Sequence, residues 1–309
     1  MKTNKKGILS IAVVGVLIIA SMAAAIMLLQ DVPADDTGDL KLTVTDDRGK
    51  NVYFADSPKR IVSLGSSFTE IVIALNESDR LVGVDYSGMT LAGIPANVTN
   101  LGKTSALSME ALLALEPDCI IIWNFGMYKD LIGDMEDKGL NVVAYYPKTV
   151  NQTLSTMERI GDMLGANATA LVDSMKARVN AVVEKTANLP DDNRTRVYLE
   201  LASKGGQTTG RGTLSNELIE MAGGKNIFAN GTGYWLANRE DVIDRNPEVI
   251  VVEDSSAHRD QYFIDTYPPT DAVENRQIYR IAAGTLTTSP RMVDALEDLA
   301  HWLQPEPFP

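Results

Sequence analysis

The sequence has a single cysteine, Cys119, and only two histidines, His258 and His301. One thiol cannot form an intrachain disulfide, and Cys119 opens an apolar run that ends at Trp123, which predicts a buried structural thiol. Two histidines and one cysteine are too few for a zinc or iron site of the usual nitrogen and sulfur ligands. We therefore expect no metal site and no resident cofactor in this chain.

Positive charge is also scarce. The 309 residues include 28 lysines and arginines against 41 aspartates and glutamates, which gives a formal net charge of −13. Proteins that bind nucleic acid need a basic surface to neutralise phosphates, so no nucleic-acid partner is expected. The chain is 45% hydrophobic and long enough for two domains of ordinary size.

The sequence motifs of common enzymes are missing as well. Ser66 lies in Gly-Ser-Ser and not in the Gly-x-Ser-x-Gly turn of hydrolases, and no serine–histidine–aspartate triad is indicated. Residues 205–212 come close to a phosphate-binding P-loop, but Arg211 replaces the required lysine and Gly212 replaces the magnesium-binding serine or threonine. We expect no catalytic residues, and the glycines predict a mobile loop.

The first part of the chain predicts export. Three lysines precede an uncharged apolar run, Gly7 to Leu29, that is long enough to span a bilayer. Residues 1–30 are thus expected to anchor the chain in the membrane, or to be a signal peptide that is cleaved near Ala23-Ala24-Ala25. No cysteine follows the run to carry a lipid, and residues 31–39 predict a flexible linker.

Beyond the linker, short apolar runs alternate with amphipathic stretches. The expected strands are 60–64, 81–84, 119–123, 141–145, 196–201, 249–252 and 278–282. The expected helices are 67–76, 108–115, 128–138, 152–164, 168–187, 214–221, 239–246 and 290–303. Strands that alternate with helices predict parallel sheets covered on both faces. The expected fold class is α/β, with two Rossmann-like lobes: an N-terminal lobe at 40–166 and a C-terminal lobe at 191–309.

The segment 167–190 between these lobes has almost no strand signal. Leu171, Met175, Val179 and Val182 are spaced to line one face of a helix. A helix from Ala168 to Ala187 would be about 30 Å long, enough to bridge two lobes. The alternative interpretation is an ordinary surface helix of the N-terminal lobe.

Five segments, taken together and in this order, resemble the substrate-binding proteins of ABC importers for iron–siderophores, haem and cobalamin. These segments are residues 57–75, 107–123, 216–228, 238–252 and 289–308. The resemblance covers nearly all of the chain from Leu40 onward. It implies two α/β lobes joined by one long helix, a metal chelate held in the cleft between them, and an ABC permease with its ATPase as partners. It also implies a binding protein that acts as a monomer and is not an enzyme.

The resemblance assigns two glutamates to docking on the permease. Glu70 and Glu240 stand where the family places one exposed glutamate on each lobe, and two separated carboxylates suit two arginines of a partner. Local roles are the alternatives. Residues 67–70 form a capping-box pattern in which Glu70 would close the start of its helix, and Glu240 would complement a helix dipole after an Asn238 cap.

Ligand-binding residues are expected in the loops that follow the strands. The candidates are Ser66, Tyr86, Trp123, Asn124 and Tyr146 in the N-terminal lobe, and Arg211, Tyr234, Trp235 and Arg291 in the C-terminal lobe. Trp123 and Trp235 are expected to stack on a flat apolar ligand, with core roles as the alternative. Arg291 stands at a helix start, where its charge opposes the dipole, so it is expected to grip an anionic group of the ligand, with a surface ion pair as the alternative.

Two other functions remain as alternatives at this stage. A membrane-anchored enzyme or metallochaperone would use the same two lobes and would retain a metal without an organic chelator. A membrane-anchored sensor ectodomain would use the fold without transport. The two tryptophans favour a corrinoid or haem over a strongly anionic siderophore, which needs more cationic side chains.

Overall fold

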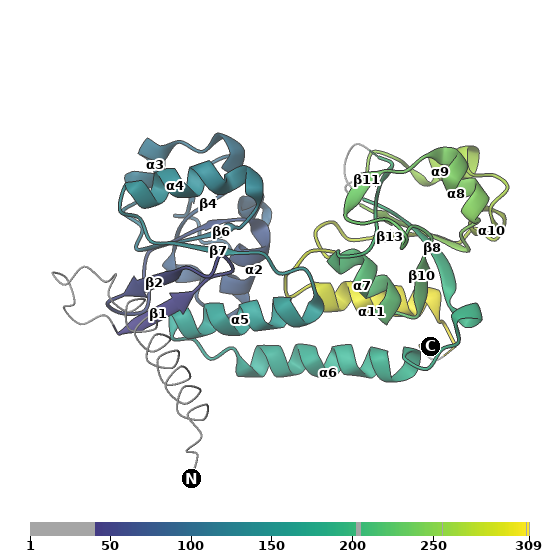
Figure 1. Ribbon diagram of the computed structural model, residues 1–309, viewed down its shortest axis with the longest axis horizontal. Helices are drawn as coiled ribbons and strands as arrows, with labels where there is room; N and C mark the ends of the chain where they lie inside the picture. Colours follow the sequence, from purple (N-terminus) through teal and green to yellow (C-terminus); the bar gives the residue numbers. More distant parts are fainter. Residues whose placement is uncertain (1–40, 202–204, 255, 307, 309) are drawn as a thin grey trace, which may run out of the picture. The chain divides into compact units, whose positions relative to one another are not determined.

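The computed structural model describes residues 41–201, 205–254, 256–306 and 308, and the chain from Leu42 onward forms one compact unit (Figure 1). The expected membrane or signal segment at 1–30 and the linker at 31–39 lie outside the described residues. In the part that is described, no helix has both the length and the apolar character needed to cross a bilayer.

The N-terminal lobe is built on a five-stranded parallel sheet. Its strand order is β5 (Thr99–Asn100), β4 (Leu81–Val84), β3 (Ile61–Leu64), β6 (Cys119–Trp123) and β7 (Val142–Tyr145). Helices α2 (Ser66–Ala74), α3 (Met109–Leu113) and α4 (Lys129–Asp137) connect these strands. Alternate residues of β6 enter two different hydrophobic clusters, Ile121 in one and Ile120 in the other. The sheet is therefore buried on both faces, which explains why its strands are continuous apolar runs.

An antiparallel hairpin precedes this sheet and was not expected. Strands β1 (Leu42–Thr45) and β2 (Asn51–Phe54) pair with each other, and the turn between them is tied to the lobe by side chains. Asp46 accepts a hydrogen bond from Ala144 N at 3.1 Å, and Arg159 forms an ion pair with Asp47 at 2.6 Å. The hairpin is short and alternates exposed with buried residues, so its apolar signal is weak.

The C-terminal lobe has a four-stranded parallel sheet and a small antiparallel ribbon. The sheet order is β10 (Gly224–Asn226), β8 (Thr195–Glu200), β12 (Val249–Glu253) and β13 (Ile278–Ile281), and the ribbon pairs β9 (Gln207–Thr209) with β11 (Tyr234–Leu236). The helices are α7 (Leu214–Met221), α8 (Arg239–Arg245), α9 (Asp260–Thr266), α10 (Asp271–Glu274) and α11 (Met292–Leu303). The glycine-rich stretch 205–212 thus contains a strand, β9, where only a mobile loop was expected.

Two helices lead from one sheet to the other. Helix α5 (Val150–Leu164) ends at Gly165, whose left-handed backbone (φ 64°) closes the helix, and α6 (Thr169–Thr186) follows. Helix α6 buries Val172, Met175, Val179 and Val182, while Leu171 is only partly buried. The predicted helix is confirmed, but Val172 takes the place expected for Leu171 on its buried face.

Helix α6 contacts both lobes. Lys176 pairs with Glu158 of α5 at 3.0 Å, and Arg178 pairs with Asp294 and Glu297 of α11 at 2.6 and 2.5 Å. One hydrophobic cluster runs without a break from β1 through α5, α6 and α7 to α11, and in Figure 1 α6 runs alongside both α5 and α11. The expected fold class is confirmed as two α/β lobes with a long helix between them. The lobe boundaries at 166 and 191 stay predictions.

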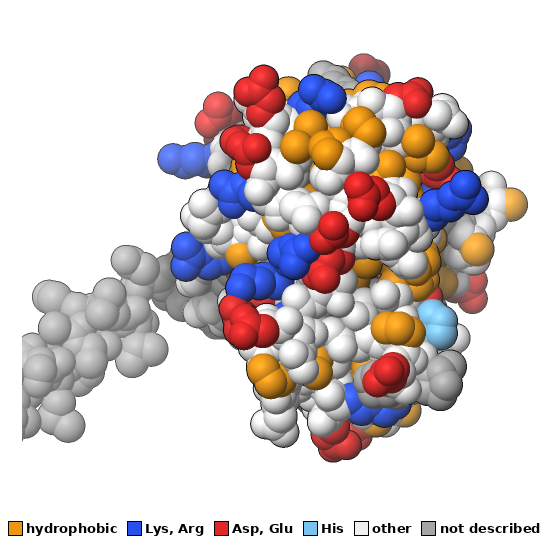
Figure 2. Space-filling view, turned by 90° about the vertical axis from the view of Figure 1, so that its right-hand side faces the viewer, with side chains coloured by type: hydrophobic (Ala, Val, Ile, Leu, Met, Phe, Trp, Pro, Cys, Tyr) orange, Lys and Arg blue, Asp and Glu red, His pale blue; other side chains and the backbone are white. Residues whose placement is uncertain are grey.

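The surface shown in Figure 2 carries charges of both signs. Basic and acidic side chains lie intermixed there, with hydrophobic side chains between them. On this face, therefore, no large area carries charge of one sign only.

Candidate functional site

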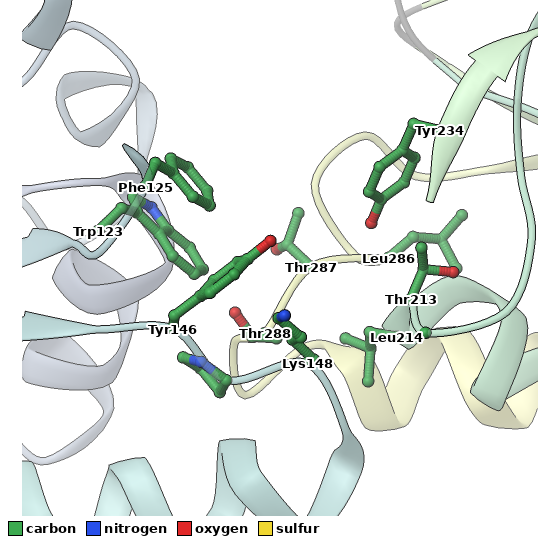
Figure 3. Close-up of a pocket in the computed structure, with 12 residues that line it drawn as sticks. Trp123, Phe125, Tyr146, Lys148, Thr213, Leu214, Tyr234, Leu286, Thr287 and Thr288 are labelled. Atoms are coloured by element: carbon green, nitrogen blue, oxygen red, sulfur yellow. The ribbon is translucent and has the colours of Figure 1, made fainter. Parts of the chain in front are cut away.

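A pocket of about 200 Å³ opens where the carboxyl ends of β6 and β7 meet the C-terminal lobe. Figure 3 shows its aromatic side chains and the polar residues that face them. Its lining consists of Trp123, Phe125, Tyr146, Pro147, Lys148, Gly212, Thr213, Leu214, Tyr234, Leu286, Thr287 and Thr288. Ligand sites of doubly wound α/β folds lie at this edge of the sheet, so the position fits a binding site.

The N-terminal lobe supplies an aromatic wall. Trp123 is the last residue of β6 and stacks on Phe125 with ring centroids 5.0 Å apart and planes inclined by 2°. Tyr146 meets Phe125 edge-on at 5.2 Å, and Phe68 of α2 packs behind Trp123 at 4.5 Å. Rings fixed in this way lose little freedom when a flat ligand stacks on them.

Gly65 makes the position of Trp123 possible. This residue is the N-cap of α2 with φ 147°, and a Cβ atom there would lie 2.5 Å from Trp123 Nε1. The tight turn between β3 and α2 therefore needs a residue without a side chain.

The C-terminal lobe supplies the start of α7 and the ribbon. Thr213 caps α7: its hydroxyl accepts a hydrogen bond from Asn216 N at 3.3 Å and donates to Gly210 O at 2.8 Å. Gly210 lies so close to the ribbon turn that a Cβ atom would stand 2.5 Å from Gly231 O. Tyr234 projects from β11 into the pocket (Figure 3).

Lys148 is the one charged residue in the lining of this pocket. Its Nζ lies 4.3 Å above the Tyr146 ring, within the range of a cation–π contact. Among the ion pairs of the described residues none includes Lys148. The pocket is therefore positively charged although the chain as a whole has a net charge of −13.

The loop before α11 brings two threonines to the pocket. Thr287 donates its hydroxyl to Gly284 O at 2.7 Å. Thr288 is only 5% exposed, and its hydroxyl has no hydrogen-bond partner among the described residues. A buried hydroxyl without a partner costs free energy, so this atom is available for a group that enters the pocket.

Three of the nine expected ligand-binding residues line the pocket: Trp123, Tyr146 and Tyr234. Four others lie outside this lining: Ser66, Tyr86, Asn124 and Arg211. Ser66 is the first residue of α2, and the backbone N–H of Asn124 donates to Tyr145 O. Tyr86, after β4, and Arg211 are exposed. Their roles as ligand contacts stay predictions without support from this pocket.

Trp235 also lies outside the pocket lining. It packs edge-on against Phe228 at 5.9 Å, beside the hydrophobic cluster of the C-terminal lobe. A Cβ atom on Gly231 would lie 2.3 Å from its ring, so the turn of the ribbon closes over the indole. The geometry favours the core role that was the alternative for this residue.

Glu70 and Arg291 were expected to have separate functions, but they pair with each other. Arg291 Nε donates to Glu70 Oε1 at 2.8 Å, and the Glu70 side chain is only 12% exposed. The capping-box alternative for Glu70 is wrong, because α2 starts after Gly65 without a side-chain cap. The hydrogen bond to Glu70 raises the pKa of Arg291 above its ordinary value.

Glu240 behaves as a residue of an exposed helix start. It lies in the first turn of α8, and its N–H donates to Asn238 Oδ1 at 2.8 Å. The expected Asn238 cap is confirmed. Docking of Glu240 and Glu70 on a permease stays a prediction.

A second polar cluster lies in the C-terminal lobe, apart from the pocket. The buried Glu200 carboxylate accepts hydrogen bonds from Ser256 Oγ at 2.7 Å and pairs with His258 Nδ1 at 2.9 Å. The Ser256 hydroxyl thus donates to the carboxylate and not to the imidazole of His258, and it accepts a bond from the His258 backbone N–H at 3.1 Å, which is the wrong order for a nucleophile activated by a base. Gly205 packs against the imidazole ring of His258.

Nine of the lining residues were not expected: Phe125, Pro147, Lys148, Gly212, Thr213, Leu214, Leu286, Thr287 and Thr288. A positional signal existed for Phe125 and Lys148, which follow the ends of β6 and β7 by two and three residues. Over the described ranges, no three His, Cys, Asp or Glu side chains cluster in a way that would hold a metal ion.

Comparison with known proteins gives one family. A family model described as periplasmic binding protein matches residues 61–284. The chain is 28% identical over 276 residues to an uncharacterized ABC transporter substrate-binding lipoprotein of Bacillus subtilis, which covers 86% of this chain and 87% of that relative. It is 25% identical over 263 residues to the vitamin B12-binding protein of Yersinia pestis, which covers 82% of this chain and 90% of the relative.

A solved structure shows the same fold. The periplasmic haem-binding protein RhuT of Roseiflexus superposes with a TM-score of 0.70 at 24% identity, over 79% of this chain and 97% of that one. The range matched by the family model contains Trp123, Tyr146 and Tyr234 and ends just before the loop of Thr287 and Thr288.

Proposed function

Because the chain belongs to the periplasmic binding protein family, whose members here are substrate-binding proteins and not enzymes, we propose that it captures a metal chelate for an ABC importer. The chelate would be of the corrinoid, haem or iron–siderophore type. The protein would hold it at the pocket on the outer side of the membrane and deliver it to the permease, which the partner ATPase drives.

The aromatic wall is the observation that carries this proposal. Trp123, Phe125 and Tyr146 present flat rings at the carboxyl ends of β6 and β7. Such rings suit the apolar face of a conjugated macrocycle, and Tyr234 faces them from the ribbon (Figure 3). A relative named for vitamin B12 binding supports the same class of ligand.

The pocket is small for such a ligand, so only one edge of the macrocycle enters it. Drug-sized ligands occupy about 300–1,000 Å³, more than the pocket offers. Residues of β11 alternate in exposure, which puts Leu236, 70% exposed, on the same side of the ribbon as Tyr234. This apolar side chain extends the contact surface beyond the pocket.

Docking on the permease would use Glu70 and Glu240. Glu240 is exposed on α8, whereas Glu70 is already paired with Arg291. An arginine of the permease would replace Arg291 as the partner of Glu70, so Glu70→Gln is expected to weaken the complex and Arg291→Gln to strengthen it. Pull-down with the reconstituted permease measures both, and equal effects of the two variants would contradict this role.

Attachment to the membrane would come from residues 1–30. The Bacillus subtilis relative is named a lipoprotein, whereas the one cysteine of this chain, Cys119, is buried in β6. The apolar run before the linker takes the place of a lipid in this proposal.

Titration of tryptophan fluorescence tests the proposal. Wild-type protein, Trp123→Phe and Trp235→Phe are titrated with cyanocobalamin, haemin and a ferric catecholate siderophore. We expect saturable quenching with one of these, recovery of the ligand unchanged, and loss of most of the quenching in Trp123→Phe but not in Trp235→Phe. Absence of saturable binding with all of them, or chemical turnover of the bound chelate, would refute the importer function.

Metal analysis separates the metallochaperone alternative. Protein purified without any chelate is incubated with ferric, cobalt and zinc salts and then dialysed. Retention of one metal ion per chain without an organic chelator would favour the metallochaperone over the importer.

A further inference from the structure

The pocket combines one cation with one unsatisfied hydroxyl. Lys148 is its single charged lining residue, and Thr288 Oγ1 is buried without a hydrogen-bond partner in the described chain. Only 5% of Thr288 is exposed, so solvent does not supply a partner for this hydroxyl. A donor of this kind suits an acceptor atom brought in by a ligand.

The start of α7 adds further donors at the same pocket. Gly212, Thr213 and Leu214 belong to the lining, and the first turn of α7 begins at Leu214. The backbone N–H groups of residues 216 and 217 both donate to Thr213. Among the hydrogen bonds of the described residues, none uses the backbone N–H of Leu214 or of residue 215. Free N–H groups and the positive end of the helix dipole favour an anion at this position.

A bond between the lobes holds Lys148 near these donors. Val150 N, two residues after Lys148, donates to Glu217 Oε2 in the first turn of α7 at 2.7 Å. This bond also engages the nearby carboxylate of Glu217 at the N-terminus of α5, away from the pocket lining. The cation and the helix start are thus fixed on the same side of the pocket.

We propose that Lys148 Nζ, Thr288 Oγ1 and the free N–H groups at the start of α7 form one anion-binding subsite that holds a carboxylate or phosphate group of the captured ligand. The inference rests on the proposed function and names the group by which the ligand is oriented: its flat body stacks on Trp123 and its acidic group points to Lys148. Charge-assisted hydrogen bonds in such a site are stronger than neutral ones.

Inorganic phosphate tests the subsite without any chelate. The thermal unfolding midpoint is measured at rising phosphate concentration and constant ionic strength for the wild type, Lys148→Met and Thr288→Val. We expect the midpoint of the wild type to rise and the apparent affinity to fall about tenfold in each variant. No rise in the wild type, or the same rise in both variants, overturns the subsite.

Two matched variants serve as controls. Lys138→Met removes one exposed lysine that precedes β7, whereas lining residues 146–148 follow the other end of that strand, and it is expected to keep the phosphate effect. Thr285→Val removes a buried hydroxyl that lies outside the lining and is already bonded to Ala282 O, and it is expected to keep the phosphate effect as well. Thr288→Val removes a buried unsatisfied group, so its own stability is expected to match or exceed that of the wild type even though phosphate binding weakens. An equal loss in Thr285→Val and Thr288→Val would overturn the assignment.

Matched ligands then identify the acidic group. Haemin and its dimethyl ester differ in their carboxylates, and cyanocobalamin and dicyanocobinamide differ in the phosphate-linked nucleotide. We expect the acidic member of at least one pair to bind about tenfold more tightly to the wild type but not to Lys148→Met. Equal affinity within both pairs overturns the subsite while leaving the importer function standing. Absence of binding by these four and by the ferric siderophore refutes the function, and the phosphate titration then decides the subsite alone.

Discussion

The ion pair between Glu70 and Arg291 is expected to stabilise the contact between the lobes. Arg291 begins α11 and Glu70 belongs to α2, and the pair joins residues 221 positions apart in the chain. Replacement of Arg291 by glutamine leaves the Glu70 carboxylate, 12% exposed, without its cationic partner. An unpaired, largely buried carboxylate is more costly than the loss of an exposed ion pair.

The magnitude follows from the exposure of the two groups. A hydrogen bond to a charged group contributes about 1.5–3 kcal/mol. Arg291 is 37% exposed, so water makes up part of the stabilisation that Glu70 loses when the arginine is replaced. We therefore expect Arg291→Gln to lower the free energy of unfolding by about 2 kcal/mol. The double variant Glu70→Gln/Arg291→Gln removes both charges, and we expect it to lose only about 1 kcal/mol.

Equilibrium urea unfolding of the wild type, both single variants and the double variant gives the coupling energy. The expected coupling is about 1 kcal/mol or more. The reasoning fails if the double variant is as unstable as the sum of the single variants, because the two side chains would then not interact. Equal urea slopes in the four proteins show that the unfolded state is unchanged.

Three further outcomes are expected. Arg178→Met breaks the ion pairs to Asp294 and Glu297, whose side chains are far more exposed than that of Glu70. Urea unfolding is therefore expected to show that the free energy of unfolding falls by only about 0.5 kcal/mol. A fall as large as that of Arg291→Gln would contradict the role assigned to burial. Gly65→Ala is expected to destabilise the protein by about 2 kcal/mol and to shift the tryptophan emission, since its Cβ collides with the Trp123 indole; unchanged emission would contradict this. Burial raises the pKa of Glu217, so the folded state favours the protonated form of this side chain. The stability of the wild type relative to Glu217→Gln is therefore expected to rise as the pH falls from 7 toward the ordinary carboxyl pKa of 4.5. A constant difference in melting temperature over that range would contradict this expectation.

Most strands and helices of the two parallel sheets follow directly from the sequence. Strands β4 and β6 and helix α7 have the bounds expected from their apolar runs and flanking caps. These elements are buried on both faces or capped locally, so the signal lies within the element itself. The ends of α5 and α6 were also expected to within two residues, because Gly165 stops one helix and starts the next connection.

The antiparallel ribbon of β9 and β11 was missed because each strand depends on a distant partner. Strands β9 and β11 are each three residues long and pair over a separation that includes α7 and β10. Strand β9 lies within a glycine-rich stretch, where the local signal predicts a loop. The same ribbon decided the position of Trp235: alternation along β11 points Tyr234 and Leu236 outward and leaves the indole between them facing Phe228.

The two side chains of the proposed subsite, Lys148 and Thr288, lack any local pattern. Lys148 resembles an ordinary surface lysine until Val150 is bonded to Glu217, 67 positions later in the chain. Thr288 is ordinary in sequence, and its hydroxyl becomes significant only because the packed loop leaves it without a partner. Both properties arise where the two lobes meet, and neither lobe encodes them alone.

Arg291 shows how a correct local argument led to an incomplete assignment. An arginine at the start of α11 opposes the helix dipole, and this conflict was taken to indicate a ligand contact. The conflict is real, but the compensating charge belongs to the protein, since Glu70 supplies a carboxylate at 2.8 Å. The two residues selected separately for functions therefore satisfy each other, and the cation left free at the pocket is Lys148, which no local conflict had marked. In the proposed subsite the acidic group of the ligand is therefore held by Lys148 and the start of α7, and not by Arg291.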